Sequence, residues 1–254
     1  MSDLFSLRDH VVLVTGASRG LGLAIAAAMA EAGALPILNG RDETTLRRAA
    51  AGLHAKGLRA ETAAFDVADL AALPREVAAI AARHGRLDAV VLNAGINIRK
   101  PLLEWETDEF QHVLTTNLTA CFVLAREAAR AMLPRGSGRI IFTGSIVGIV
   151  ARPTIHAYAA AKAGLGGMAK TLAVELAPNN ITVNVICPGF FDTELNTPLT
   201  QNADFNAWIK TRCPLGRWAQ PEEIGGAAVF LASRAGSFVT GHMLVVDGGL
   251  TINM

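Results

Sequence analysis

Short apolar runs alternate along this chain with longer alanine-rich segments. The short runs predict buried β-strands at residues 10–15, 34–39, 58–65, 87–93, 139–144, 181–187 and 242–249. The longer segments predict helices at residues 21–33, 42–57, 69–84, about 107–133, 155–177 and 221–233. Residues 190–215 contain two prolines and show no regular period, so they are expected to be irregular.

Strands that alternate with helices over the whole length predict a parallel, doubly wound sheet. We therefore expect an α/β fold of Rossmann type, with seven parallel strands and helices on both faces. No linker or repeat divides the chain, so residues 1–254 are expected to form a single domain. Within it, residues 190–215 are a candidate lid over a substrate. Pro36 lacks a backbone N–H and is expected near the start of its strand.

Composition excludes several classes of protein. Of the 254 residues, 51% are apolar and 18% are charged, which is enough apolar surface for a large core. The net charge of +1 gives no electrostatic case for nucleic acid or an anionic membrane as partner. The opening MSDLFSLRDH lacks the basic and long apolar regions of a signal peptide. The best apolar run, 21–38, is interrupted by Glu31, Gly33 and Pro36, so no membrane span is expected.

Cysteine and histidine patterns bear on metals and compartment. Cys121, Cys187 and Cys213 are far apart and odd in number, which argues against a disulfide framework and a zinc cluster. Unpaired cysteines are typical of a reducing cytoplasm. The six histidines show no metal-ligand spacing, so no catalytic metal is expected.

A glycine-rich turn joins the first predicted strand to the first helix. It reads TGASRGLG over residues 15–22, with glycines at 16, 20 and 22. Such glycines allow the backbone to approach a pyrophosphate, and the helix N-terminus offers free N–H groups. The turn predicts a dinucleotide site, although its G-x-x-x-G-x-G spacing differs from G-x-G-x-x-G.

The end of the second strand distinguishes NADP from NAD. It reads Asn39-Gly40-Arg41, without the carboxylate that would accept a hydrogen bond from the ribose of NAD. The Arg41 guanidinium suits a 2′-phosphate, and Arg19 could join it. NADP is therefore favoured over NAD, with Asp42 as the residue that would favour NAD.

Tyr158, the only tyrosine, precedes Lys162 by four residues in a predicted helix. Positions four apart share a helix face, so the phenol and the ammonium should lie side by side. A free tyrosine phenol ionises near pH 10, and a nearby cation favours its ionised form. The pair therefore suits an acid/base role, with a packed tyrosine beside a surface lysine as the alternative.

In order and spacing, these motifs resemble the short-chain dehydrogenase/reductase family over nearly the whole chain. The glycine turn matches its cofactor loop, Asp66 its adenine-contacting aspartate, and NAG (93–95) the motif after its fourth strand. The resemblance implies a homotetramer. It also implies cofactor contacts from Gly16, Ser18, Arg19, Gly20, Leu21, Gly22, Asn39, Arg41, Asp66, Val67, Asn93, Ala94, Gly95, Tyr158, Lys162, Pro188, Gly189 and Thr193.

The same resemblance extends to four residues that match the family's catalytic tetrad: Asn117, Ser145, Tyr158 and Lys162. It implies that Tyr158 is the acid/base and that Ser145 hydrogen-bonds the substrate oxygen. Asn117 would make a backbone or water contact that completes a proton relay from Lys162. The implied reaction is hydride exchange between a nicotinamide and a secondary alcohol or ketone.

Within the family, the chain resembles gluconate 5-dehydrogenases most. The similarity lies in DLFSL (3–7), NAGINIRKP (93–101), PGFFDTEL (188–195) and FNAWIKTRCPLGRW (205–218). It implies a sugar acid or polyol as substrate. Cationic side chains for a carboxylate would be Arg99, Arg152 and His156, beside Ser145 and Tyr158. The segment 142–158 departs from this pattern because it is largely apolar.

Two other functions stay open. A 3-oxoacyl carrier-protein reductase or broad carbonyl reductase would share the cofactor loop, and Arg126 with Arg130 could contribute to docking an acidic carrier. A non-catalytic NADP-binding sensor is the alternative of another class, but a binding module needs no phenol–ammonium pair.

Overall fold

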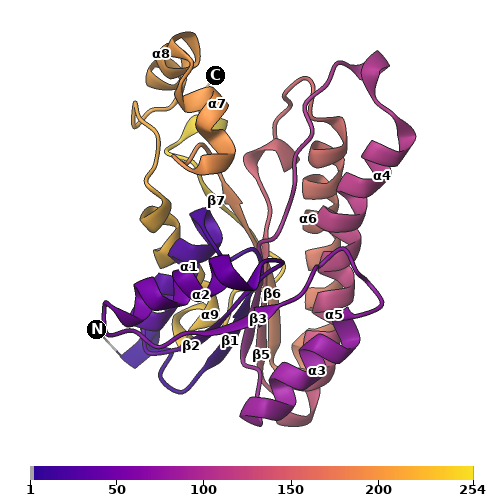
Figure 1. Cartoon of the computed structure of the whole chain (residues 1–254), viewed down its shortest axis with the longest axis vertical. Helices are drawn as coiled ribbons and strands as arrows, with labels where there is room; N and C mark the ends of the chain where they lie inside the picture. The colour runs from indigo at the N-terminus through magenta and orange to yellow at the C-terminus, as the bar shows by residue number, and fades with distance from the viewer. Residues whose placement is uncertain (1–2, 254) are drawn as a thin grey trace.

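Seven parallel strands form one sheet in the order β3-β2-β1-β4-β5-β6-β7 (Figure 1). The structure is a computed structural model, and it describes residues 3–253. The strands are β1 (Val11–Val14), β2 (Leu35–Gly40), β3 (Glu61–Ala64), β4 (Ala89–Leu92), β5 (Gly138–Thr143), β6 (Ile181–Pro188) and β7 (Met243–Val246). The predicted doubly wound, Rossmann-type parallel sheet is confirmed.

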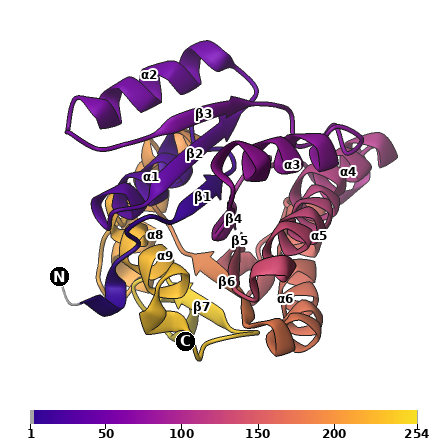
Figure 2. The same ribbon diagram turned by 90° about the horizontal axis from the view of Figure 1, so that it is seen from below.

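Helices cover both faces of the sheet (Figure 2). They are α1 (Gly20–Glu31), α2 (Glu43–His54), α3 (Leu73–His84), α4 (Thr107–Leu114), α5 (Ala120–Met132), α6 (His156–Leu176), α7 (Thr197–Thr200), α8 (Ala203–Arg212) and α9 (Gly225–Ala232). Helices α1, α2 and α9 pack on one face, while α3, α5 and α6 pack on the other. Among residues 3–253, no helix is both long and apolar enough to cross a membrane.

The central strands divide their side chains between two buried layers. In β1, Val12 and Val14 join the core beneath α1, whereas Val11 and Leu13 join the core beneath α5. A parallel sheet covered on both faces favours unbroken apolar strands, and this explains the short apolar runs of the sequence. Pro36 is the second residue of β2, near its start as expected, and it precedes the residues that pair with β3.

The long helix expected over 107–133 is interrupted. A π-helical turn over residues 115–119 separates α4 from α5. Its cause is a contact from outside the helix, because Asn117 in this turn bonds the backbone of Ile96. A π-turn inside a helix is frequently found at a functional site.

Three other predicted boundaries were too generous. The helix expected at 69–84 begins only at Leu73, since Asp69 instead accepts a hydrogen bond from the Ala72 N–H. The strand expected at 58–65 begins at Glu61, where this edge strand starts to pair with β2. The helix expected at 221–233 opens with a 3₁₀ turn, so α9 starts at Gly225.

The expectation of an irregular segment over 190–215 is wrong. Two helices, α7 and α8, form most of it and lie above the sheet in Figure 1. Pro198 falls in the first turn of α7, where a missing N–H costs little. Asn202 caps α8, and its side chain accepts a hydrogen bond of 2.9 Å from the Phe205 N–H.

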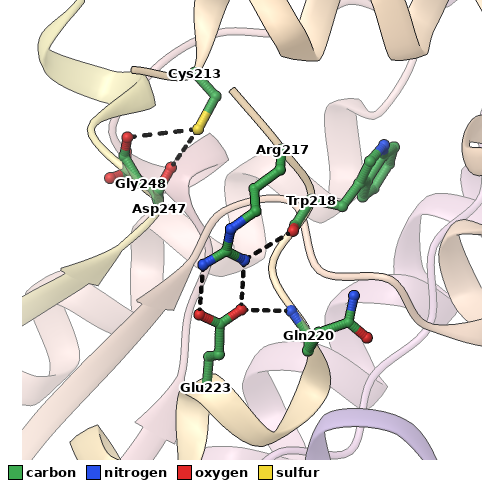
Figure 3. A network of polar contacts seen from close by, with 7 residues as sticks. All are labelled: Cys213, Arg217, Trp218, Gln220, Glu223, Asp247 and Gly248. Carbon is green, nitrogen blue, oxygen red and sulfur yellow. Dashed lines mark hydrogen bonds and ion pairs between the residues drawn. The ribbon is translucent and has the colours of Figure 1, made fainter. Parts of the chain in front are cut away.

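The chain that follows α8 is anchored to the rest of the fold (Figure 3). The Cys213 thiol lies 3.6 and 3.4 Å from the carbonyl oxygens of Asp247 and Gly248. Arg217 donates hydrogen bonds of 2.7 and 2.8 Å to the two carboxylate oxygens of Glu223. Helices α7 and α8 therefore have a fixed C-terminal attachment.

Candidate active site

A cleft of about 640 Å³ opens where the strands end and the loops after β1, β2, β4, β5 and β6 meet. The sheet order reverses between β1 and β4, and ligands of doubly wound sheets bind at this switch point. Every residue predicted to hold a dinucleotide lines this cleft: Gly16, Ser18, Arg19, Gly20, Leu21, Gly22, Asn39, Arg41, Asp66, Val67, Asn93, Ala94, Gly95, Tyr158, Lys162, Pro188, Gly189 and Thr193.

Two glycines of the turn are required by the protein's own packing. A Cβ on Gly22 would lie 2.3 Å from the Gly16 carbonyl oxygen and 2.6 Å from Nδ2 of Asn93. Gly16 has φ +63°, and its Cβ would meet Ala94 Cα at 2.9 Å. Thr15, for which no role was predicted, accepts hydrogen bonds from the Asn93 and Ala94 N–H groups at 2.9 and 3.0 Å. The glycine turn and the NAG motif thus form one packed unit.

The start of α1 is open to an anion. Arg19 precedes the helix without a side-chain capping hydrogen bond, and no acidic residue lies in the first turn. The first N–H groups of a helix lack intrahelical partners and attract phosphate. The cradle therefore fits the pyrophosphate of a dinucleotide.

The residues at the end of β2 and just after it have different roles. Asn39 donates hydrogen bonds of 3.1 and 3.0 Å to the carbonyls of Ala63 and Phe65, which ties β2 to β3. Asp42 does not line the cleft. It caps α2, and the hydrogen bond from the Thr45 N–H, 2.6 Å long, lowers its pKa. Arg41 is exposed and lines the cleft, and it is not part of the α2 cap.

Arg19 is already engaged. It forms a 2.7 Å ion pair with Glu194, which lies just before α7 and also lines the cleft. Both side chains are largely exposed, so this pair is weak and a phosphate could displace it.

Lys162 and Tyr158 share one face of α6. The buried Lys162 ammonium donates a 2.6 Å hydrogen bond to the Thr143 carbonyl at the end of β5. Its nitrogen lies 5.5 Å from the centre of the Tyr158 ring. Thr143 was not anticipated, because only the folded sheet brings its carbonyl beneath α6.

Ser145 and Asn117 occupy different positions relative to the cleft. Ser145 lines it, and its hydroxyl accepts a 3.3 Å hydrogen bond from the Val147 N–H. Asn117 is fully buried behind it. Its amide accepts from the Ile96 N–H at 2.9 Å and donates to the Ile96 carbonyl at 2.8 Å. Asn117 thus makes a backbone contact that holds the loop after β4, and its part in a proton relay from Lys162 stays a prediction.

Two further guanidinium groups, Arg99 and Arg152, line the cleft besides Arg19 and Arg41. Burial and the nearby Arg99 both lower the pKa of Arg152. His156 was expected to line the cleft, but it does not. Its ring packs edge-on against Trp105, with 6.2 Å between the ring centres. Asn97 was not predicted, yet it lines the cleft with a buried Oδ1 that has no partner among the described residues.

Metal chemistry has no candidate centre in the part of the chain that the structure describes. Across residues 3–253, no three histidine, cysteine, aspartate or glutamate side chains are placed to hold an ion. The three cysteines are free and buried, and burial raises the pKa of Cys121 and of Cys187 to about 11.

Comparisons with known proteins agree with this geometry. Residues 16–251 match a family model described as enoyl-(acyl carrier protein) reductase. A gluconate 5-dehydrogenase of Gluconobacter oxydans (strain 621H) is 43% identical, over 99% of this chain and 98% of that protein. A 3-oxoacyl-(acyl-carrier-protein) reductase of Chlamydia muridarum (strain MoPn / Nigg) is 40% identical, over 96% and 98%. The crystal structure of a gluconate 5-dehydrogenase from Burkholderia cenocepacia J2315, in complex with NADP and tartrate, has a TM-score of 0.96, 41% identity and 99% coverage of both chains.

Proposed function

The chain belongs to the short-chain dehydrogenase/reductase family, and we propose that it interconverts a secondary alcohol and a ketone of a sugar acid with NADP(H). The substrate pair is of the gluconate and 5-ketogluconate type. One observation carries the proposal: a single cleft joins an anion-binding glycine turn, the Tyr158–Lys162 pair and two guanidinium groups. Relatives named for gluconate and the solved relative with NADP support the same reading.

Tyr158 is the proposed proton carrier. In ketone reduction its phenol donates a proton to the forming alkoxide, and in alcohol oxidation its phenolate takes that proton back. The Lys162 ammonium stabilises the negative charge on the phenolate, and the Thr143 carbonyl holds this ammonium in place. The Ser145 hydroxyl donates to the substrate oxygen, which orients the reacting carbon.

Asn117 is proposed to support this relay from behind. Its side chain is committed to the backbone of Ile96, so it orders the loop below the nicotinamide position. A Cβ on Gly95 would lie 3.2 Å from Asn117 Oδ1 and 3.8 Å from the Lys162 ammonium, so these groups are closely packed.

NADP(H) supplies or accepts the hydride at its nicotinamide C4 when bound. The glycine turn and the start of α1 would hold its pyrophosphate, and Asp66 would hold the adenosine end. Arg41 and Arg19 would pair with the 2′-phosphate that distinguishes NADP from NAD. Asp42 does not compete for the ribose, because it caps α2.

Arg99 and Arg152 are the proposed partners of the substrate carboxylate. Ser145 and Tyr158 would contact the oxygen on the reacting carbon. His156 would act only indirectly, through its packing on Trp105. The segment 190–215, with α7 and α8, would close over the substrate as a lid.

A carrier-protein reductase is the second candidate, supported by the 40% identical relative. Such an enzyme needs a basic surface for an acidic carrier. Here Arg126 and Arg130 both pair with Glu127, at 2.7 and 3.5 Å, which reduces the charge that they offer. The sugar-acid function is therefore preferred.

The proposed assembly is a homotetramer in the cytoplasm. Val174 on α6 is 80% exposed, and Phe238, just before β7, is fully exposed. Apolar side chains left open in this way favour contact with other copies. A Cβ on Gly167 would meet nothing within 4 Å, whereas one on Gly164 or Gly166 would meet Leu118 or Met243 of the same chain.

Initial rates of NADPH oxidation at 340 nm test the substrate class. The panel is 5-ketogluconate, a neutral ketose and a β-ketoacyl thioester. The proposal predicts the highest kcat/KM for the keto acid. A thioester that reacts faster than the keto acid would instead establish the carrier-protein reductase.

A further inference from the structure

Arg152 lies on the faces of two aromatic rings. Its guanidinium carbon is 4.9 Å from the centre of the Phe205 ring and 5.8 Å from the centre of the Phe190 ring. Both distances are within cation–π range. Phe205 belongs to α8, whereas Arg152 lies in the loop between β5 and α6. The contact therefore connects the proposed lid to the loop that follows β5.

The ring of Phe205 is held in place by its neighbours. Its centre lies 5.2 Å from those of Phe190 and Trp208 and 5.8 Å from that of Trp218. Trp218 donates a 2.8 Å hydrogen bond to Asn206, the residue after Phe205. This support gives Phe205 a defined orientation against Arg152.

Arg152 has no carboxylate to satisfy it. None of the ion pairs among residues 3–253 includes it, and the only charged group that shifts its pKa is Arg99, which lowers it. A guanidinium that stacks by its face keeps its N–H donors free along its edge. Arg99 and Arg152 place two guanidinium groups in one cleft, which favours the binding of an anion there.

We propose that Phe205 is a positioning residue for substrate charge: its ring holds the Arg152 guanidinium so that its N–H edge meets the substrate carboxylate. This inference rests on the proposed function, since it requires an anionic substrate. Recognition of the carboxylate is then coupled to the position of α8, because any shift of the helix moves the surface on which Arg152 lies.

Steady-state kinetics of Phe205→Leu test the role, with 5-ketogluconate and a neutral ketose as substrates. Loss of the ring should raise KM for the keto acid about three- to tenfold, the range of one cation–π contact. KM for the neutral ketose and both kcat values should stay near wild type. Phe205→Tyr, which keeps the aromatic face, should restore the low KM.

Trp208→Leu is the matched control, because Trp208 lies in the same cluster on the same helix but is not a ring on which Arg152 rests. Loss of packing alone should affect the two substrates equally. If Phe205→Leu behaves in that way, or if tyrosine does not rescue it, the inference is overturned. Phe205→Met replaces leucine if thermal unfolding shows that the leucine variant is not folded.

A double variant with Arg152→Gln separates this inference from the proposed function. If Phe205 acts through Arg152, Phe205→Leu adds no further increase in KM for the keto acid once Arg152 is glutamine, so the double variant matches Arg152→Gln alone. A wild-type enzyme that prefers the neutral ketose would refute the anionic substrate and the inference together. A wild type that prefers the keto acid, with additive effects of the two substitutions, would refute the inference alone.

Discussion

The Lys162 ammonium lies 5.5 Å from the centre of the Tyr158 ring while it donates a 2.6 Å hydrogen bond to the Thr143 carbonyl. The cation is thus fixed by the sheet as well as by its helix. The Lys162 side chain is already buried and ordered in the folded chain. It therefore loses no further conformational entropy when it stabilises the phenolate during turnover.

Tyr158→Phe should lower kcat about 10²- to 10⁴-fold, the usual contribution of a general acid or base. The ring is retained, so NADPH should bind with nearly unchanged affinity. Stopped-flow or steady-state rates at 340 nm measure the first quantity, and NADPH fluorescence titration measures the second. A variant that keeps kcat within about threefold of wild type would remove Tyr158 from the chemistry.

Arg41→Ala should raise the Kd for NADPH about tenfold or more, since a hydrogen-bonded charge pair contributes about 1.5–3 kcal/mol. The Kd for NADH, which has no 2′-phosphate, should hardly change. Arg48→Ala is the matched control, because Arg48 is exposed on α2 outside the cleft. Equal losses for both cofactors would contradict the assigned role of Arg41.

Gly22→Ala should destabilise the fold by about 1–3 kcal/mol, because its Cβ would overlap the Gly16 carbonyl. Gly52→Ala makes the same chemical change on α2, where the new Cβ meets nothing within 4 Å. There it should stabilise the chain by about 0.5–1 kcal/mol through helix propensity. Urea unfolding of the two variants measures the difference, and similar free energies would contradict the packed glycine turn.

Glu223 should make stability depend on acid pH. Hydrogen bonds from Arg217 and from the Gln220 N–H lower its pKa from 4.5 to about 2. A pKa that is lower in the folded chain stabilises the fold above pH 4.5, and this contribution disappears as the pH falls towards 2. The stability difference between wild type and Glu223→Gln should therefore shrink over that interval. Parallel pH profiles would show that the ion pair of Figure 3 contributes nothing.

Local patterns were enough to predict the sheet and the cofactor end of the cleft. The central strands β1, β4 and β6 are buried throughout, so each leaves a continuous apolar run, and the order of motifs places the strand ends together. The glycines of the turn were predicted only from the approach of a phosphate. Gly22 is required by contact with Gly16 and Asn93, in addition to any phosphate.

Long-range contacts account for what the sequence could not predict. The π-turn at Asn117 depends on Ile96, 21 residues earlier. His156 was expected in the cleft, but its ring packs against Trp105 instead. Helix α8 is only ten residues long, and its aromatic side chains pack on Phe190 outside the helix, so the sequence shows no regular apolar period there. Lys162 is held by the backbone carbonyl of Thr143, and because every residue has such a carbonyl, the sequence does not indicate which one is used.

Oxidation of D-gluconate by NADP⁺ tests the central claim most directly. Absorbance at 340 nm counts the NADPH formed, and NMR of the same sample identifies the product. The proposed function predicts 5-ketogluconate and NADPH in equal amounts, with neither formed by Tyr158→Phe. A different keto acid would contradict the assigned position of oxidation, and the absence of any NADPH would contradict gluconate as the substrate.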